Sequence, residues 1–156
     1  MKLMRKVISL VLIVLFITAC GSKKEEFYLT YNNHDIKLDT VFDTQLHGNY
    51  NDSFESANCA FGERDITYIY DDIEIETYGN SKNELIIYSI VLTNEKIKTN
   101  EGIGLYDNIE DAIKKYGDDF MKNENVYTYD RGNTSLIFIT SNGIISSIEY
   151  RLNNID

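Results

Sequence analysis

Short runs of alternating apolar and polar residues follow one another from residue 27 onward and predict a protein rich in β-strand. The first two runs, Phe27–Tyr31 and Asp35–Asp39, are separated by Asn32-Asn33, a pair typical of tight turns. They predict an N-terminal β-hairpin. Residues 41–46 are compatible with a helical turn, and residues 47–57 are polar and aperiodic, which indicates a surface loop.

Two groups of three strands are predicted next, one on each side of a single helix. Asp71-Asp72 and Gly79-Asn80-Ser81 are the turns of the first group, and Gly132-Asn133 and Asn142-Gly143 are those of the second. Asn-Gly is a strong signal for a two-residue hairpin turn. The six predicted strands cover residues 67–72, 74–78, 84–92, 126–130, 135–140 and 144–152.

The helix is predicted between Tyr106 and Asp119. We expect Asp107 to cap its N-terminus, Glu110 to complete a capping box, and Gly117 to end it. The residues of its apolar stripe have helical spacing and are Ile109, Ala112, Ile113 and Tyr116.

Similar tyrosine-rich segments recur at nearly the same offset in the two halves of the chain. Tyr68-Ile69-Tyr70-Asp71 matches Tyr127-Thr128-Tyr129-Asp130, and residues 88–92 match residues 146–150. The order of elements also agrees between the halves. The sequence therefore predicts an α+β fold of two repeats, about 27–98 and 99–156, that follow the N-terminal β-hairpin. Each repeat is expected to be a short helix followed by a three-stranded antiparallel sheet.

Strict alternation assigns the residues of the two most apolar strands to faces. Along strand 84–92 it places Ile86, Tyr88, Ile90 and Leu92 on one face, and Leu85, Ile87, Ser89 and Val91 on the other. Along strand 144–152 it places Ile144, Ile148, Tyr150 and Leu152 on one face, and Ile145, Ser147, Glu149 and Arg151 on the other. Both faces of the first strand are apolar, so its second face is expected either to be covered by another layer or to meet a partner.

The first residues have the organisation of a secretion signal. Three basic residues precede an apolar run, 7–17, which is shorter than the roughly 20 residues that a membrane-spanning helix requires. The quartet Ile17-Thr18-Ala19-Cys20, followed by Gly21, resembles a bacterial lipobox, whose cysteine is diacylated and becomes the first residue of the mature protein. An ordinary signal peptide with a cysteine at the cleavage point is the alternative.

These features predict the organisation of the whole chain. We expect residues 1–19 to be a lipoprotein signal peptide, Cys20 the site of lipid attachment, residues 20–26 a lipidated tether, and residues 27–156 a single α+β domain. The expected location is the extracytoplasmic face of the cell membrane, where two acyl chains suffice for stable anchoring.

Acidic residues outnumber basic ones, and the excess grows when the signal is removed. The chain has 25 Asp and Glu against 15 Lys and Arg, and three of the basic residues lie in the signal. Such a surface repels nucleic acid and anionic lipid headgroups, so neither is an expected partner beyond the lipid on Cys20.

No pattern in the sequence indicates catalysis, a cofactor or a metal. Cys59 has no partner for a disulfide if Cys20 is acylated, and it is expected to be a small buried residue rather than a reactive thiol. His34 and His47 are expected to be exposed polar residues, because a zinc site would need further ligands in fixed geometry. The acidic clusters fit turns and helix caps, and none has the spacing of a calcium loop. We therefore expect a protein that is not an enzyme.

Several segments resemble a group of uncharacterised bacterial lipoproteins. They are Cys59-Ala60-Phe61-Gly62, Tyr68-Ile69-Tyr70, residues 74–78, Tyr88-Ser89-Ile90, residues 99–103, Tyr116-Gly117 and residues 146–150. The tandem helix-plus-sheet repeats of this group resemble β-lactamase-inhibitor-like proteins and small outer-membrane lipoproteins of the SmpA/OmlA type. The resemblance implies a protein-binding scaffold whose sheet face is the contact surface, and it carries over no functional residue.

Together these observations predict a membrane-anchored extracytoplasmic lipoprotein that acts as a non-catalytic protein-binding module. One alternative is a lipoprotein immunity or inhibitor protein against a secreted toxin or hydrolase, for which an acidic surface would suit a basic target. The other is an envelope enzyme or a carrier of a metal or small ligand.

Overall fold

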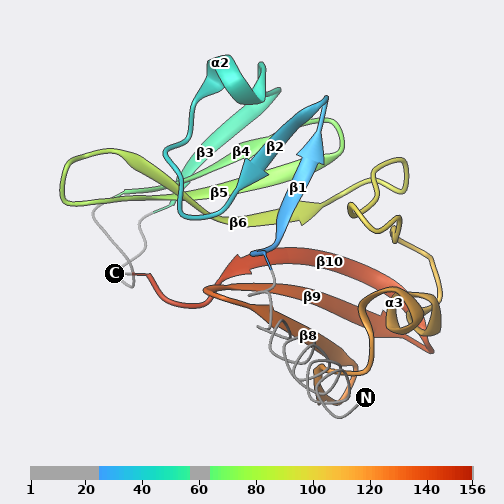
Figure 1. Ribbon diagram of the computed structural model, residues 1–156. Coiled ribbons are helices and arrows are strands. Elements are labelled where there is room, and N and C mark those ends of the chain that lie inside the picture. The colour runs from blue at the N-terminus through green and yellow to red at the C-terminus, as the bar shows by residue number, and fades with distance from the viewer. Residues whose placement is uncertain (1–24, 57–63, 156) are drawn as a thin grey trace, which may run out of the picture.

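The computed structural model describes residues 25–56 and 64–155. Its main feature is an antiparallel sheet of eight strands, accompanied by a separate two-stranded hairpin (Figure 1). The hairpin comprises β1 (Tyr28–Tyr31) and β2 (His34–Lys37), and the helices are α2 (Thr44–His47) and α3 (Ile109–Tyr116). The strands of the large sheet are β3 (Asp52–Ser56), β4 (Asp65–Ile69), β5 (Ile73–Gly79), β6 (Leu85–Leu92), β7 (Met121–Asn123), β8 (Val126–Arg131), β9 (Thr134–Ser141) and β10 (Ile144–Leu152).

Two four-stranded meanders meet edge to edge in this sheet. The strand order is β3-β4-β5-β6-β10-β9-β8-β7, so the last strand of each meander is central. At the junction β6 and β10 are antiparallel, with Ile90 opposite Tyr150 and Leu92 opposite Ile148. This pairing joins segments from the two halves of the chain into one continuous surface.

The predicted α+β fold of two repeats, each a short helix followed by a three-stranded sheet, is wrong. Strand accounts for 51% of the described residues and helix for 9%, and one eight-stranded sheet replaces the two predicted sheets. Two strands were also absent from the prediction. Strand β3 lies within the predicted loop 47–57, and β7 follows the predicted helix. Both are short polar edge strands that are defined by backbone pairing with β4 and β8 rather than by an apolar pattern.

The turns predicted from asparagine and glycine are confirmed. Asn32 and Asn33, between β1 and β2, have φ angles of 50° and 63°. Asn142 and Gly143, between β9 and β10, have φ angles of 52° and 82°. Two successive positive φ angles fit the right-handed twist of the flanking strands, which explains why Asn and Gly occupy these positions.

Helix α3 is confirmed, but its cap differs from the prediction. Asn108 is the N-cap, and its side-chain oxygen accepts a hydrogen bond from Glu110 N at 3.0 Å. Asp107 instead accepts from Gly104 N at 2.8 Å and pairs with Lys98 at 3.0 Å, so it closes the preceding loop. Gly117, with a φ angle of 91°, ends the helix and donates its N–H to Ile113 O.

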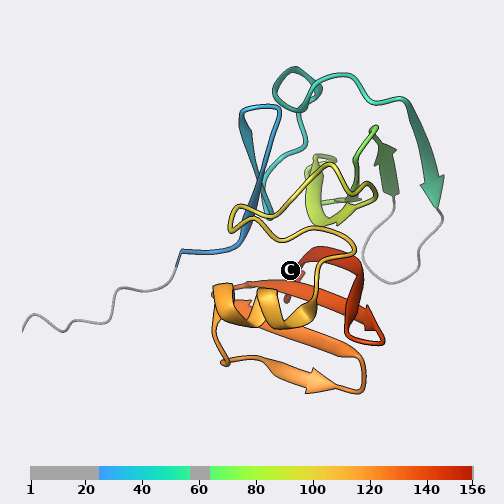
Figure 2. The ribbon, with the colours of Figure 1, turned by 90° about the vertical axis from the view of Figure 1, so that its right-hand side faces the viewer.

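The core lies on one face of the sheet. A row of cross-strand neighbours on this face runs from β4 to β8 and is buried throughout: Tyr68, Ile75, Ile90, Tyr150, Leu136 and Tyr129. Leu29 and Ile36 of the hairpin and Ala112 of α3 belong to the same apolar cluster. In Figure 2 the hairpin lies to the left of the strands of the first meander, and α3 is drawn in front of the strands of the second. They form a second layer that covers this face, and burial of each large apolar side chain contributes roughly 1.5–3 kcal/mol.

Two β-bulges shift the faces that strict alternation predicts. In β6 the register passes from Glu76↔Ser89 to Thr77↔Ile87, so Tyr88 is an extra residue. In β10 it passes from Ile145↔Thr140 to Ser147↔Ile139, so Ser146 is extra. Ile87 and Ile145 therefore point to the core face and are fully buried. Strict alternation had placed both on the other face of the sheet.

Because of the bulge in β10, two adjacent isoleucines are expected to differ in how much their substitution by alanine destabilises the protein. Ile145 is 0% exposed, whereas Ile144 is 40% exposed. We expect Ile145→Ala to lower the free energy of unfolding by about 2–5 kcal/mol through cavity formation. Ile144→Ala should lower it by less than about 1 kcal/mol. Urea unfolding of both variants measures this, and a larger loss for Ile144→Ala would contradict the register.

Candidate functional site

The second face of the large sheet is not covered by the hairpin or by α3. Two rows of cross-strand neighbours define it, and we call their residues the open face. The first row, from β3 to β7, is Asp52, Ile69, Glu74, Val91, Glu149, Ile137, Thr128 and Met121. The second row, from β3 to β8, is Phe54, Thr67, Glu76, Ser89, Arg151, Ser135 and Asp130.

Apolar and acidic side chains alternate along most of the first row, and the second row is mainly polar and charged. Val91 is partly exposed between Glu74 and Glu149, and Phe54 at the edge is 53% exposed. The two rows hold one guanidinium, that of Arg151, and five carboxylates, those of Asp52, Glu74, Glu76, Asp130 and Glu149. The open face is therefore a mixed apolar and acidic surface, unlike the uniformly polar outer face of a solvated sheet.

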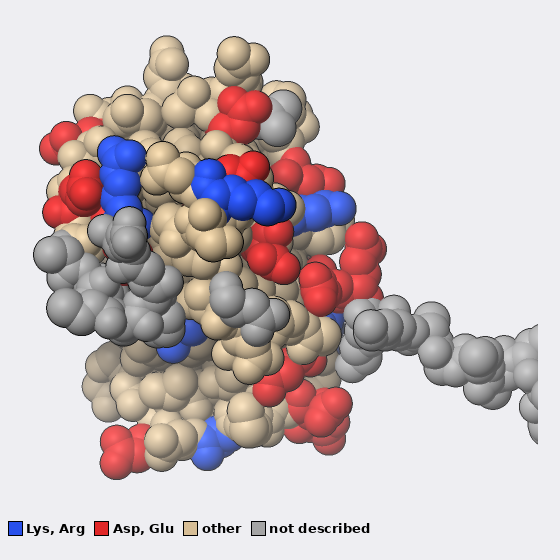
Figure 3. Space-filling model, turned by 90° about the vertical axis from the view of Figure 1, so that its left-hand side faces the viewer, with Lys and Arg blue, Asp and Glu red and all other residues tan. Residues whose placement is uncertain are grey.

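Acidic side chains are also prominent elsewhere on the molecule. On the side drawn in Figure 3, carboxylates lie on the upper and lower parts of the surface, and basic side chains form a few separate groups. Acidic side chains are thus not confined to the open face.

One ion pair lies at the middle of the open face, on β10. Arg151 Nε and Nη2 donate to the two oxygens of Glu149 at 2.6 Å and 2.7 Å. Ser89 Oγ, across the β6–β10 junction, donates to Glu149 Oε1 at 3.2 Å. The Glu149 side chain is 16% exposed and that of Arg151 is 53% exposed. Arg151, the one basic residue of the two rows, thus forms a bidentate salt bridge with Glu149.

Tyr88, the bulge residue of β6, lies among carboxylates. Burial raises the pKa of its hydroxyl, and the charge of Glu76, a hydrogen bond to Glu76, and the charges of Asp65 and Glu149 raise it further. All of these effects oppose a negative charge at the hydroxyl. Tyr88 therefore stays a neutral hydrogen-bond donor and reports a negative potential at the centre of the open face.

A cavity of about 370 Å³ lies beside Tyr88. Its walls combine apolar and charged groups from β5, β6, β10 and the segment after β10. The lining residues are Glu76, Tyr88, Glu149, Arg151, Leu152, Asn153 and Ile155. The open face therefore has a hollow near its centre.

The start of the domain is held on the opposite side, by contacts that we call the anchor junction. Phe27 N donates to Thr134 Oγ1 at 2.8 Å, and Asn133 N donates to Glu26 Oε1 at 3.2 Å. The Arg131 guanidinium lies 4.2 Å from the centre of the Phe27 ring. These contacts fix the direction in which the chain approaches β1.

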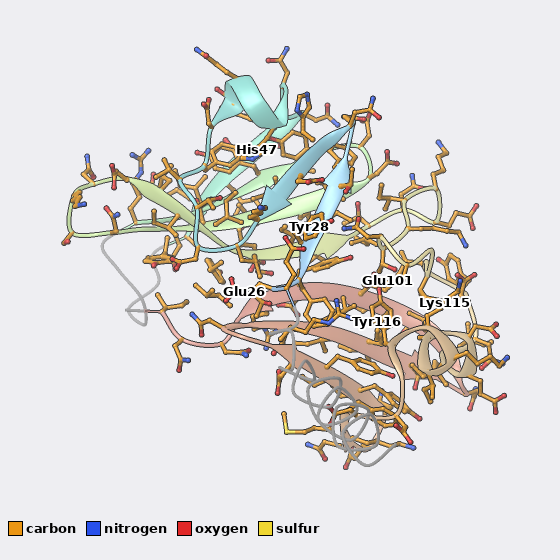
Figure 4. The ribbon with its side chains drawn as sticks, in the orientation of Figure 1. Glu26, Tyr28, His47, Glu101, Lys115 and Tyr116 are labelled. Carbon is orange, nitrogen blue, oxygen red and sulfur yellow. The ribbon has the colours of Figure 1, made fainter. Side chains whose placement is uncertain are left out.

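Glu101 connects the anchor junction to α3. Its carboxylate lies 3.5 Å from Arg131 and accepts a hydrogen bond from the Tyr116 hydroxyl at 2.6 Å (Figure 4). Burial, the neighbouring Tyr150 and this hydrogen bond raise the pKa of Tyr116, so the hydroxyl remains a donor. The Glu101 carboxylate is thus paired with the Arg131 guanidinium and hydrogen-bonded to the Tyr116 hydroxyl, which fits a structural role for the anchor junction.

The cysteines and histidines discussed in the sequence analysis differ in whether the structure describes them and in how far they are buried. Cys20 and Cys59 lie outside the described residues. His34 is exposed at the start of β2, as expected. His47, at the end of α2, is buried, so the expectation of an exposed residue was wrong. Within residues 25–56 and 64–155, no group of three or more His, Cys, Asp or Glu side chains is arranged to hold a metal ion.

His47 is buried because α2 folds it against an aromatic neighbour. Its ring centre lies 5.3 Å from that of Phe42, and Nδ1 accepts a hydrogen bond from Asp43 N at 3.4 Å. Burial lowers the pKa of His47, the charge of Asp43 opposes this effect, and His34 lowers the pKa further. The folded protein therefore favours the neutral ring.

The helices in the described part of the chain are too short and too polar to cross a bilayer.

The open face could not be recognised from the sequence. Its central residues come from β5, β6 and β10, and they become neighbours only through the β6–β10 pairing and the bulge at Tyr88. The one available signal was the alternation Ser147, Glu149, Arg151 in the last strand, which indicated a polar face.

The chain was compared with protein-family models, with curated proteins and with solved structures. No family model, curated protein or solved structure matches it. The resemblance to bacterial lipoproteins stays a prediction carried by the quoted motifs. The open face and the anchor junction are the features from which a function can be inferred.

His47 gives the stability of the protein a testable pH dependence. Its lowered pKa means that the unfolded chain takes up a proton below pH about 6.5 before the folded protein does, so stability falls as pH decreases from there towards the folded pKa. We expect His47→Asn to reduce this loss between neutral and mildly acidic pH. His34→Asn should reduce it only slightly, because the charge of His34 is the smallest of the effects on the pKa of His47. Urea midpoints at both pH values measure the effect, and an equal pH dependence in all three proteins would contradict it.

Proposed function

We propose that the protein is a membrane-anchored extracytoplasmic lipoprotein that acts as a non-catalytic protein-binding module through its open face. The observation that carries this proposal is the difference between the two faces of one sheet. The first is covered by the hairpin and α3, and the second presents apolar and acidic side chains across eight strands.

The composition of the open face suits protein recognition. Ile69, Val91 and Phe54 provide apolar area, and the carboxylates between them provide polar specificity. Protein interfaces combine an apolar centre with polar groups in this way. An edge-to-edge row of eight strands is also wide enough for a partner to contact both halves of the chain.

The direction of the chain at the anchor junction supports the same function. Residues 25–27 approach β1 from the side of the hairpin (Figure 2), and Phe27 belongs to the core cluster on the covered side of the sheet. A chain of seven residues, such as 20–26, spans at most about 25 Å. A lipid on Cys20 would therefore hold the covered layer towards the bilayer and leave the open face directed away from it.

The acidic composition favours one more specific candidate, an immunity or inhibitor protein for a secreted toxin or hydrolase with a basic surface. The five carboxylates of the open face support it. Complementary charge speeds association and excludes wrong partners.

Capture experiments test the binding function. The full-length protein with a C-terminal affinity tag is expressed in cells, and its partners are isolated from solubilised envelopes. We expect a protein to be retained by the parent chain and to be lost with Phe54→Arg or Val91→Arg on the open face. Tyr106→Arg is the matched control, because Tyr106 precedes α3, lies outside the open face and is 67% exposed.

The outcome separates the candidate classes, provided that thermal unfolding shows all variants to be folded. Equal retention by Phe54→Arg, Val91→Arg and the parent chain would exclude the open face. Stoichiometric copurification of a metal or small ligand without any protein would contradict the binding module and favour a carrier or an envelope enzyme.

The anchor has an independent test. We expect Cys20→Ser to abolish labelling by radioactive palmitate and to release the protein from the membrane fraction, because no acyl chain remains to hold it. Membrane retention equal to that of the parent chain would refute lipid attachment at Cys20.

A further inference from the structure

We propose that the centre of the open face binds a positively charged segment of a partner protein, and that a lysine or arginine side chain of this segment occupies the cavity between Glu76, Tyr88 and Glu149. The inference rests on the proposed binding function and specifies the chemistry of the partner. Net charge, the arrangement of the carboxylates and the shape of the cavity support it.

Charge is the first argument. The two rows of the open face hold five carboxylates, and their one base, Arg151, is already paired with Glu149. Glu74 and Glu76 lie on β5 without a base opposite them in their rows, since Val91 and Ser89 are their neighbours on β6. A partner that brings positive charge to β5 and β6 would neutralise these carboxylates.

The arrangement around Tyr88 is the second argument. The charges of Glu76, Asp65 and Glu149, which lie on three different strands, all raise the pKa of the Tyr88 hydroxyl. The Tyr88 hydroxyl donates to Glu76 and fixes that carboxylate beside the cavity. A preoriented carboxylate accepts a charge-assisted hydrogen bond without a further ordering cost.

The shape of the cavity is the third argument. The cavity has a volume of about 370 Å³ and is lined by the apolar groups of Tyr88 and Ile155 and the carboxylates of Glu76 and Glu149. Arg151 also lines it, and its charge is already paired with Glu149. Lysine and arginine combine a long apolar stem with a charged end, so they can cover apolar walls while the charge meets carboxylates. An acidic or purely apolar segment would bury Glu76 without bringing it a base.

A direct binding measurement tests the inference. The probe is a fluorescein-labelled peptide of alternating Lys and Ser, titrated with the detergent-solubilised full-length protein and followed by fluorescence anisotropy. A peptide of alternating Glu and Ser is the control probe. We expect the Lys peptide to bind, the Glu peptide not to bind, and the affinity for the Lys peptide to fall as salt is added.

Variants distinguish the cavity from the overall negative charge. Glu76→Gln keeps a hydrogen-bond acceptor for Tyr88 and should weaken binding of the Lys peptide by roughly tenfold, the value of one charge-assisted hydrogen bond. Arg151→Gln should strengthen binding of the Lys peptide severalfold, because Arg151 no longer competes with the peptide for Glu149. Glu110→Gln on the exposed side of α3 is the matched control for charge and should change affinity less than about twofold.

Opposite signs for Glu76→Gln and Arg151→Gln cannot arise from general destabilisation. Equal effects of Glu76→Gln and Glu110→Gln, or a weaker affinity with Arg151→Gln, would overturn the cavity as the site. The captured partner supplies a separate readout. If it is lost with Val91→Arg but retained in full by Glu76→Lys, the binding module stands and this inference falls. If neither substitution reduces retention, the proposed function falls.

Discussion

The pairing of β6 with β10 is the interaction on which the rest of the structure depends. Four residue pairs, from Ile148↔Leu92 to Arg151↔Ser89, join the two meanders. On one face this ladder places Ile90 beside Tyr150 in the core. On the other it places Ser89 beside Arg151 and Val91 beside Glu149 at the centre of the open face. Because side chains alternate across a sheet, one set of backbone hydrogen bonds fixes both the core and the candidate binding surface.

The two sides of the large sheet differ in what covers them. The hairpin and α3 fill one side, and the anchor junction holds the start of the domain there through Phe27, Glu101 and Arg131. The opposite side keeps apolar residues such as Val91 partly exposed among carboxylates. A lipid anchor on the first side and recognition on the second would be mechanically compatible, because neither uses the surface of the other.

Local features of the fold could be predicted from the sequence, and long-range ones could not. Asn-Asn and Asn-Gly turns, the six apolar strands and the amphipathic helix each have a pattern within a few residues, and these predictions hold. Strands β3 and β7 have no such pattern, because only backbone pairing at the sheet edges defines them. The bulges at Tyr88 and Ser146 interrupt alternation without a sequence signal, so the predicted faces of Ile87 and Ile145 were wrong. The candidate site shares this limit, since its residues meet only through the β6–β10 pairing.

The central claim is that a partner contacts the open face and not the covered side. Methyl NMR spectra of the protein, recorded with and without its captured partner, test this claim most directly. The structure predicts that the methyl resonances of Ile69 and Val91, which are partly exposed on the open face, shift on binding. Those of Ile73 and Ile148, which point into the core, should change little. Shifts confined to Leu29 of the hairpin and Ile113 of α3, with the open-face methyl groups unchanged, would contradict it.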